Sequence, residues 1–296
     1  MIGMHFTSPT PADPIHDVDW VRIWDMQVDW SRVHVGPNQF DWARLDDFIS
    51  RYATAGCKIL YTVHGTPAWA CEAGTDDSHY APWMPPKSNG RPFSPDVMVE
   101  FVNALLARYA GKIHAIEVGN ELQLREFCAN YDTKTLNFWA AMTQKVYQNV
   151  KKNHPGVTVL ANPVLPRPTS GGIKKGQRYW DALAKKGWPI DAFSCHIYPK
   201  GPDKCGKLFM ELFNETKAAV KAQKAHTKKL WVTEYNLAML ERVLPSDKQD
   251  KYLKKIYSET KGAFLFPYAW NRVGDLQGVD WSINGAGWSA VKKYGK

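Results

Sequence analysis

The strongest constraint on the fold is a regular alternation of short apolar segments with longer amphipathic ones. Eight short segments are rich in β-branched and aromatic residues, which favours strands; they are residues 2–6, 20–25, 58–63, 113–118, 157–162, 190–198, 229–235 and 263–270. The stretches between them have apolar residues at three- and four-residue spacing, which is typical of helices with one buried face. Examples are residues 41–56, 95–111, 136–153 and 248–259.

The number and length of these units favour a closed barrel. Nearly continuous apolar strands that alternate with helices indicate a parallel sheet covered by helices. Eight units in 296 residues suit the size of a (β/α)8 barrel. The alternative is an open doubly wound sheet, but no glycine-rich phosphate loop follows the first strand. No linker interrupts the chain. We therefore expect residues 1–296 to form a single α/β domain, a TIM barrel with long loops at the carboxyl ends of its strands.

Composition excludes several classes of function. The net charge is +9, but the basic residues gather in pairs at most and are not interleaved with aromatics, so nucleic-acid binding is not expected. An acidic substrate is compatible with this charge. No apolar run reaches about 18 residues, so no membrane span is expected. No signal peptide is visible, although a leader could have been removed. We expect a secreted or periplasmic protein, with the cytoplasm as the alternative.

The cysteines do not predict a metal site or a cofactor. The chain has five, and their spacing matches no metal-ligand pattern. Cys57 and Cys195 lie in segments that we expect in the core, whereas Cys71, Cys128 and Cys205 lie in expected loops. A disulfide between Cys71 and Cys128 is conceivable, and it would favour an oxidising compartment.

Two expected strand-following loops carry several of the 13 tryptophans. Trp69 and Trp83 follow the third strand, and Trp281 and Trp288 follow the eighth. Because barrel active sites are built from the loops at the carboxyl ends of the strands, we expect both loops to wall the site. The alternative is that these tryptophans only cap the barrel mouth.

Two carboxylates reach the expected barrel mouth from different strands. Alternate residues of a strand face the same side, so Glu117, Gly119 and Glu121 share a face of the fourth strand. We expect Glu117 to lie deep, as a structural group held by hydrogen bonds or a cation. Glu121 lies at the end of that strand, and Glu234 ends the seventh. A buried carboxylate without partners costs several kcal/mol, so catalysis explains this pair better than packing does.

Other residues at or near the strand ends could surround a ligand: Arg22, His64, Asn120, His196, Tyr198 and Trp270. An arginine beside a carboxylate lowers the pKa of that carboxylate, and aromatic faces suit sugar rings. Two carboxylates in a mouth lined by tryptophan favour glycoside hydrolysis. The alternatives are a barrel that binds polysaccharide without cutting it and a metal-dependent barrel hydrolase that uses His5, His64 and His196.

The motifs add a resemblance to a known family. "GNE" on the fourth strand and "TEY" on the seventh resemble the clan A retaining glycoside hydrolases. Together with "WVRIWD", "YTVHGTPAWA" and "HIYP", they make the chain similar to glycoside hydrolase family thirty-nine, particularly its bacterial members that cut exopolysaccharides. The resemblance implies Glu121 as general acid/base and Glu234 as nucleophile. It implies that Asn120, Arg22, His196, Tyr198 and Trp270 lie around the sugar.

The chain departs from the family pattern at two positions, and we do not expect it to contain one of the family's domains. The family usually has Trp where Gly119 stands and Pro where Leu122 stands, which bears on substrate fit. Its β-sandwich domain is not expected here, because little chain follows the eighth strand.

The expected reaction is a double displacement with retention of configuration. This reaction needs carboxyl groups about 5 to 5.5 Å apart, against roughly 6.5 to 9.5 Å in inverting enzymes. Aromatic loops on both sides predict an extended cleft and internal cleavage of a polysaccharide or oligosaccharide, with a closed pocket as the alternative. We expect a monomer.

Overall fold

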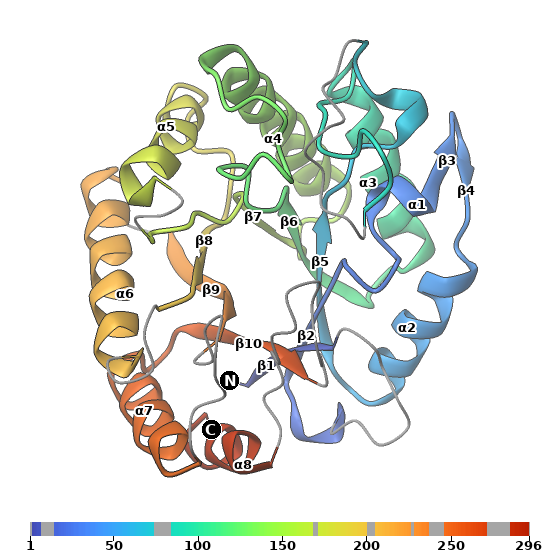
Figure 1. Ribbon diagram of the computed structural model, residues 1–296. Helices are drawn as coiled ribbons and strands as arrows, with labels where there is room; N and C mark the ends of the chain where they lie inside the picture. The colour runs from blue at the N-terminus through green and yellow to red at the C-terminus, as the bar shows by residue number, and fades with distance from the viewer. Residues whose placement is uncertain are drawn as a thin grey trace.

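The computed structural model describes residues 2–6, 15–73, 84–167, 171–199, 205–225, 228–236, 246–270 and 285–295. Within these residues, eight parallel strands close into a barrel, and helices surround it (Figure 1). The barrel strands are β1 (Gly3–Phe6), β2 (Trp20–Ile23), β5 (Lys58–Val63), β6 (Ile113–Val118), β7 (Thr158–Leu160), β8 (Ala192–Ile197), β9 (Lys229–Tyr235) and β10 (Phe264–Trp270). Each lies within one of the eight predicted segments, and the predicted (β/α)8 barrel is confirmed.

The helices follow the strands as the sequence predicts. They are α1 (Trp30–Val33), α2 (Ala43–Thr54), α3 (Asp96–Arg108), α4 (Thr133–Asn153), α5 (Gly172–Ala184), α6 (Cys205–Ala222), α7 (Ser246–Glu259) and α8 (Gly285–Tyr294). Helix α2 shows why such segments are helical: Leu45, Ile49 and Tyr52 recur at helical spacing and are all buried. The N-terminus of α4 is capped by Asp132, whose side chain accepts a hydrogen bond from the Thr135 backbone at 2.7 Å.

The connection from β2 to α2 holds an additional antiparallel hairpin beside α1. It consists of β3 (His34–Gly36) and β4 (Gln39–Phe40). Two short 3-10 helices, η1 (Ile15–Asp17) and η2 (Ala68–Ala70), lie in the connections before β2 and after β5. No helix in the described ranges is both long and apolar enough to cross a membrane.

The barrel interior changes from apolar to polar along the strands. Its lower part is filled by a cluster of apolar side chains: Trp20, Leu60, Ala115, Leu160, Ala192, Trp231 and Phe266. Two residues further along four of these strands, on the same face, stand Arg22, Thr62, Glu117 and Thr233. The apolar layer therefore closes the bottom of the barrel, and the polar residues lie at its carboxyl-terminal end.

The conceivable disulfide between Cys71 and Cys128 is not formed. Both residues are free cysteines, as are Cys57 and Cys195. The Cys71 thiol donates to the Lys87 carbonyl at 3.4 Å, and the Cys128 thiol donates to the carbonyl of Asn130 at 3.2 Å. These backbone partners hold the two thiols in separate loops.

Candidate active site

An ion pair lies at the base of the barrel mouth. Arg22 on β2 and Glu117 on β6 are fully buried, and the Glu117 Oε2 atom accepts from Arg22 Nε at 3.0 Å and from Nη2 at 2.7 Å. Thr62 on β5 and Thr233 on β9 also donate to Glu117, at 2.9 and 2.8 Å. Burial by itself raises the pKa of Glu117, but the charges of Arg22 and His196 and the hydrogen bonds from Arg22 and Ser194 together hold that pKa below its usual value. Glu117 is deep and hydrogen-bonded, as predicted.

Glu234, at the upper end of β9, receives a donor on each of its oxygens. Arg22 Nη1 donates to Oε1 at 2.5 Å, and the Tyr198 hydroxyl donates to Oε2. His196 Nδ1 is 3.5 Å from the same Oε2 atom. These donors hold the Glu234 carboxylate in a fixed orientation at the mouth.

Glu121 stands on a bent backbone rather than on the strand itself. Strand β6 ends at Val118, and Gly119 and Glu121 both have positive φ angles, +91° and +41°. From the two-residue period alone, Glu121 would be the last residue of a straight strand. The structure instead places it in a left-handed turn, which is uncommon for a residue other than glycine. Such strain concentrates at functional sites.

Hydrogen bonds hold this turn on both sides. The Asn120 backbone donates to His64 Nδ1 at 3.2 Å, and the Leu122 backbone donates to Asn162 Oδ1 at 3.4 Å. The Asn120 side chain accepts from Arg22 Nη2 at 2.9 Å. His64 therefore supports the turn that carries Glu121, and its pKa is lowered to about 3, first by burial and then by Arg22.

Burial sets the electrostatic character of Glu121. The residue is only 8% exposed, and burial raises its pKa to about 7 against the opposing charges of Arg167 and Arg22. Its Oε1 atom lies 2.7 Å from His196 Nδ1. Burial lowers the pKa of His196 to about 4, so this imidazole is neutral at pH 7. Glu121 can therefore hold a proton near neutral pH, as a general acid must.

The two carboxylates are close together. One oxygen of Glu121, one of Glu234 and a ring nitrogen of His196 all lie within 4.8 Å of one another. In the described part of the chain, these three residues are also the group whose ligand atoms lie close enough together to hold a metal ion. The histidines considered for a metal site do not form such a group: His5 Nε2 bonds to Asp25 at 2.6 Å, and His64 accepts from a backbone amide.

Of the three tryptophans predicted around a ligand, Trp69 is the one whose side chain the structure describes. Trp69 donates to the His34 carbonyl at 2.8 Å, and its ring packs against His34 and Phe93 beside the β3–β4 hairpin. Trp83 lies outside the described residues. Trp270 ends β10 opposite Phe6, but its side chain also lies outside the described part.

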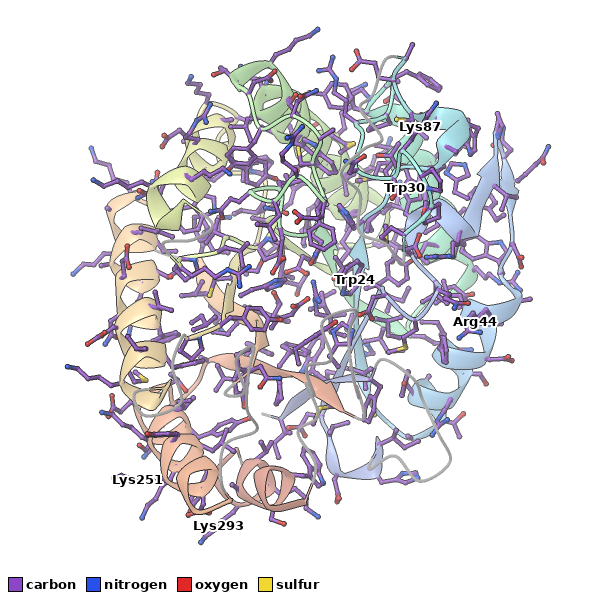
Figure 2. All side chains as sticks on the ribbon, in the orientation of Figure 1. Trp24, Trp30, Arg44, Lys87, Lys251 and Lys293 are labelled. Atoms are coloured by element: carbon purple, nitrogen blue, oxygen red, sulfur yellow. The ribbon has the colours of Figure 1, made fainter. Side chains whose placement is uncertain are left out.

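Trp24, which was not among the residues expected around a ligand, lies at the site instead. Figure 2 shows it near the middle of the view down the barrel, whereas Lys251 and Lys293 project from the outer helices. The Arg22 guanidinium lies 5.8 Å from the centre of the Trp24 ring, which also contacts His64 and Phe127 edge-on. The sequence signal that could have placed Trp24 at the site is its spacing, because Trp24 stands two residues after Arg22 in "WVRIWD".

The two departures from the family pattern concern packing around the turn. A Cβ atom at Gly119 would lie 3.1 Å from Asn162 Oδ1 and 3.4 Å from the Trp139 ring of α4. Leu122 is fully buried in the main hydrophobic core. Both positions therefore bear on how the turn that carries Glu121 packs.

Comparison with known proteins supports the fold. No protein-family model matches the sequence, and no curated protein matches it. Among solved structures, a GH39 enzyme from Xanthomonas axonopodis pv. citri aligns with a TM-score of 0.74 and 16% identity over 98% of this chain and 64% of its own. A glucosidase from Croceicoccus marinus has a TM-score of 0.72 and 14% identity, over 99% of this chain and 66% of its own.

This chain has the fold of GH39 enzymes. A GH39 β-xylosidase from Caulobacter crescentus also aligns, with a TM-score of 0.71 and 16% identity over 98% of this chain and 70% of its own. The resemblance inferred from the motifs is thus confirmed for the fold. The chain spans about two thirds of the length of these structures.

Proposed function

We propose that the protein is a retaining glycoside hydrolase that cleaves β-glycosidic bonds in a polysaccharide, with residues 1–296 as its single catalytic domain. The observation that carries this proposal is the close pairing of two carboxylates that have different hydrogen-bond partners. Glu234 is held by Arg22 and Tyr198, and a Glu121 oxygen lies within 4.8 Å of a Glu234 oxygen. This proximity of the two carboxylates is compatible with the shorter spacing of retaining enzymes, about 5 to 5.5 Å between the carboxyl groups.

The reaction proceeds in two displacements. An oxygen of Glu234 attacks the anomeric carbon, and the bond from that carbon to the leaving oxygen breaks. Glu121 donates its proton to the leaving oxygen, which leaves as an alcohol. Glu121, now a carboxylate, takes a proton from water, and the water oxygen displaces Glu234 from the sugar. Two inversions give net retention, and both carboxyl groups return to their starting states.

Internal cleavage of a bacterial exopolysaccharide, outside the cytoplasm, is the finer part of the proposal. It is supported by the family resemblance of the motifs, and the net charge of +9 is compatible with an acidic polymer. A panel of plant and bacterial polysaccharides, with product lengths measured over time, tests it. We expect early products of several sugar units, whereas release of monosaccharide alone would contradict internal cleavage.

Trapping the covalent intermediate tests the assigned roles. A 2-deoxy-2-fluoro glycoside with a good leaving group slows the hydrolysis of the intermediate, so the sugar should remain on the nucleophile. We expect peptide mapping to find the label on Glu234 and none on the matched Glu234→Gln variant. A label on another carboxylate would overturn the assignment.

A metal-dependent hydrolase is the second candidate, because Glu121, His196 and Glu234 could offer three ligand atoms. The contacts of Glu234 argue against it. One oxygen accepts from the Arg22 guanidinium and the other from Tyr198, so a divalent cation would compete with a fixed positive charge. We expect activity to survive chelator treatment. Loss of activity that added divalent cation restores would favour the metal enzyme.

A further inference from the structure

We propose that Glu117 is a positioning residue for the proposed reaction: it fixes the Arg22 guanidinium beneath Glu234 and balances the arginine's charge there. The inference rests on the proposed function, since it assigns to Glu117 control over the proposed nucleophile and acid. Glu117 is fully buried beneath the mouth and acts through Arg22.

The arginine is shared between two carboxylates in a defined way. Its Nε and Nη2 atoms donate to Glu117, and its Nη1 atom donates to Glu234. With two of its three nitrogens on Glu117, the planar guanidinium has one orientation, and that orientation aims Nη1 at Glu234. Both bonds end on one oxygen of Glu117, Oε2, and the rigid fork of the guanidinium lets them form together.

Glu117 is in turn fixed by neighbours on other strands. Thr62 of β5 donates to Oε2, and Thr233 of β9 donates to Oε1. Thr233 directly precedes Glu234 in the chain, so the same few bonds join β2, β5, β6 and β9 below the mouth. A buried ion pair is weak evidence for stability, because well-packed apolar residues are often equally stable. The apolar layer just below shows that this barrel can be filled that way.

The charges around the site show what Glu117 contributes. Glu121 faces Arg22 from β2, the neutral His196 from β8 and Arg167 from the segment after β7. It also faces three carboxylates: Glu126, Glu117 and, with an oxygen within 4.8 Å, Glu234. Glu117 faces Arg22 and His196. Glu234 faces Arg22, His196 and Tyr198. Without Glu117, the charge of Arg22 would be offset only by the reacting carboxylates, so the pKa of Glu121 would fall.

The test compares Glu117→Gln with two variants that keep the negative charge. Glu117→Gln has the same shape but no charge. We expect kcat to fall about 10- to 100-fold, because small misplacements can cost about 10²-fold. The basic limb of the pH dependence of kcat/KM should move to lower pH, with KM changed by less than about threefold. Glu117→Asp keeps the charge with a shorter reach. Because the charge is kept, the basic limb of kcat/KM should return to its wild-type pH. Because the reach is shorter, kcat should stay low.

Thr62→Val is the matched control, because it removes one hydrogen bond to Glu117 without altering any charge. It should keep the pH limb of the wild-type protein. The inference is overturned if Glu117→Gln shows the same limb and kcat as Thr62→Val. If Glu117→Gln does not fold, Glu117→Asp decides by itself: wild-type kcat in that variant would contradict the positioning role. Lack of glycosidase activity in the wild-type protein would instead refute the proposed function.

Discussion

At the scale of single residues, Glu121 combines three properties that are unfavourable outside an active site. The residue is only 8% exposed, its backbone is left-handed, and burial raises its pKa to about 7. A structural role explains none of these. A general acid explains the raised pKa, because such a group should hold its proton near the working pH.

Glu121→Gln should therefore stabilise the protein, and more so at higher pH. The pKa of Glu121 is raised in the folded protein, so its contribution to stability is fully present below pH 4.5 and is lost as pH rises through about 7. Glutamine has no such pH dependence. We expect the gain in free energy of unfolding to grow between these pH values and to reach about 3 kcal/mol at most, at 1.36 kcal/mol per pKa unit. Urea unfolding at pH 4.5, 6 and 8 measures it; a gain that does not vary with pH would contradict the raised pKa.

Alanine variants, tested with and without added azide, should distinguish the roles of the two carboxylates. Glu234→Ala should lose more than about 10³-fold in kcat, because the nucleophile is gone. Glu121→Ala should lose about 10²- to 10⁴-fold on substrates whose leaving group needs a proton, and much less on activated aryl glycosides. Added azide should give a glycosyl azide of inverted configuration with Glu234→Ala and of retained configuration with Glu121→Ala. The reverse pattern would exchange the two roles.

At the scale of elements, strand β6 shows how far the sequence could predict the site. The two-residue period of a strand correctly placed Glu117 deep in the barrel. It could not show that the strand ends at Val118, because a turn with positive φ depends on Asn162 and His64 from other strands' ends. The same limit explains why Trp24 was not predicted at the site. Its neighbour Phe127 is about 100 positions away in sequence.

Gly119→Ala should destabilise this turn by about 1 to 2 kcal/mol. Its φ of +91° disfavours any side chain, and a Cβ atom would lie 3.1 Å from Asn162 Oδ1. Gly56→Ala is the matched control, because Gly56 has a φ of +80° and a Cβ atom there would have no neighbour within 4 Å. The loss in free energy of unfolding for Gly119→Ala, minus the loss for Gly56→Ala, measures the cost of crowding at Gly119. Equal losses would show that packing around the turn tolerates the methyl group.

At the scale of the whole molecule, barrel closure assembles the site from distant segments. Arg22 meets Glu117 across 95 positions and Glu234 across 212. Strand β1 pairs with both β2 and β10, which joins the two ends of the barrel. Sequence periodicity predicted the strands and hence which ends meet at the mouth. It did not predict the sharing of one arginine between two carboxylates, which depends on side-chain geometry.

The fold should not depend on disulfides. Cys57, Cys71, Cys128 and Cys195 are all free, so Tm should agree within about 1 °C with and without reductant, since loss of a disulfide costs about 2 to 5 kcal/mol. Thiol titration of the denatured protein should find at least these four thiols. A lower Tm in reductant would show that a disulfide forms in solution.

The stereochemistry of the first product tests the proposed function most directly. Hydrolysis of a β-linked oligosaccharide cut by the protein can be followed by proton NMR before the released sugar equilibrates in water. Two displacements through Glu234 predict that the β-anomer appears first and the α-anomer grows only later, at the rate of spontaneous mutarotation. Early appearance of the α-anomer would mean a single displacement by water and would contradict the retaining mechanism.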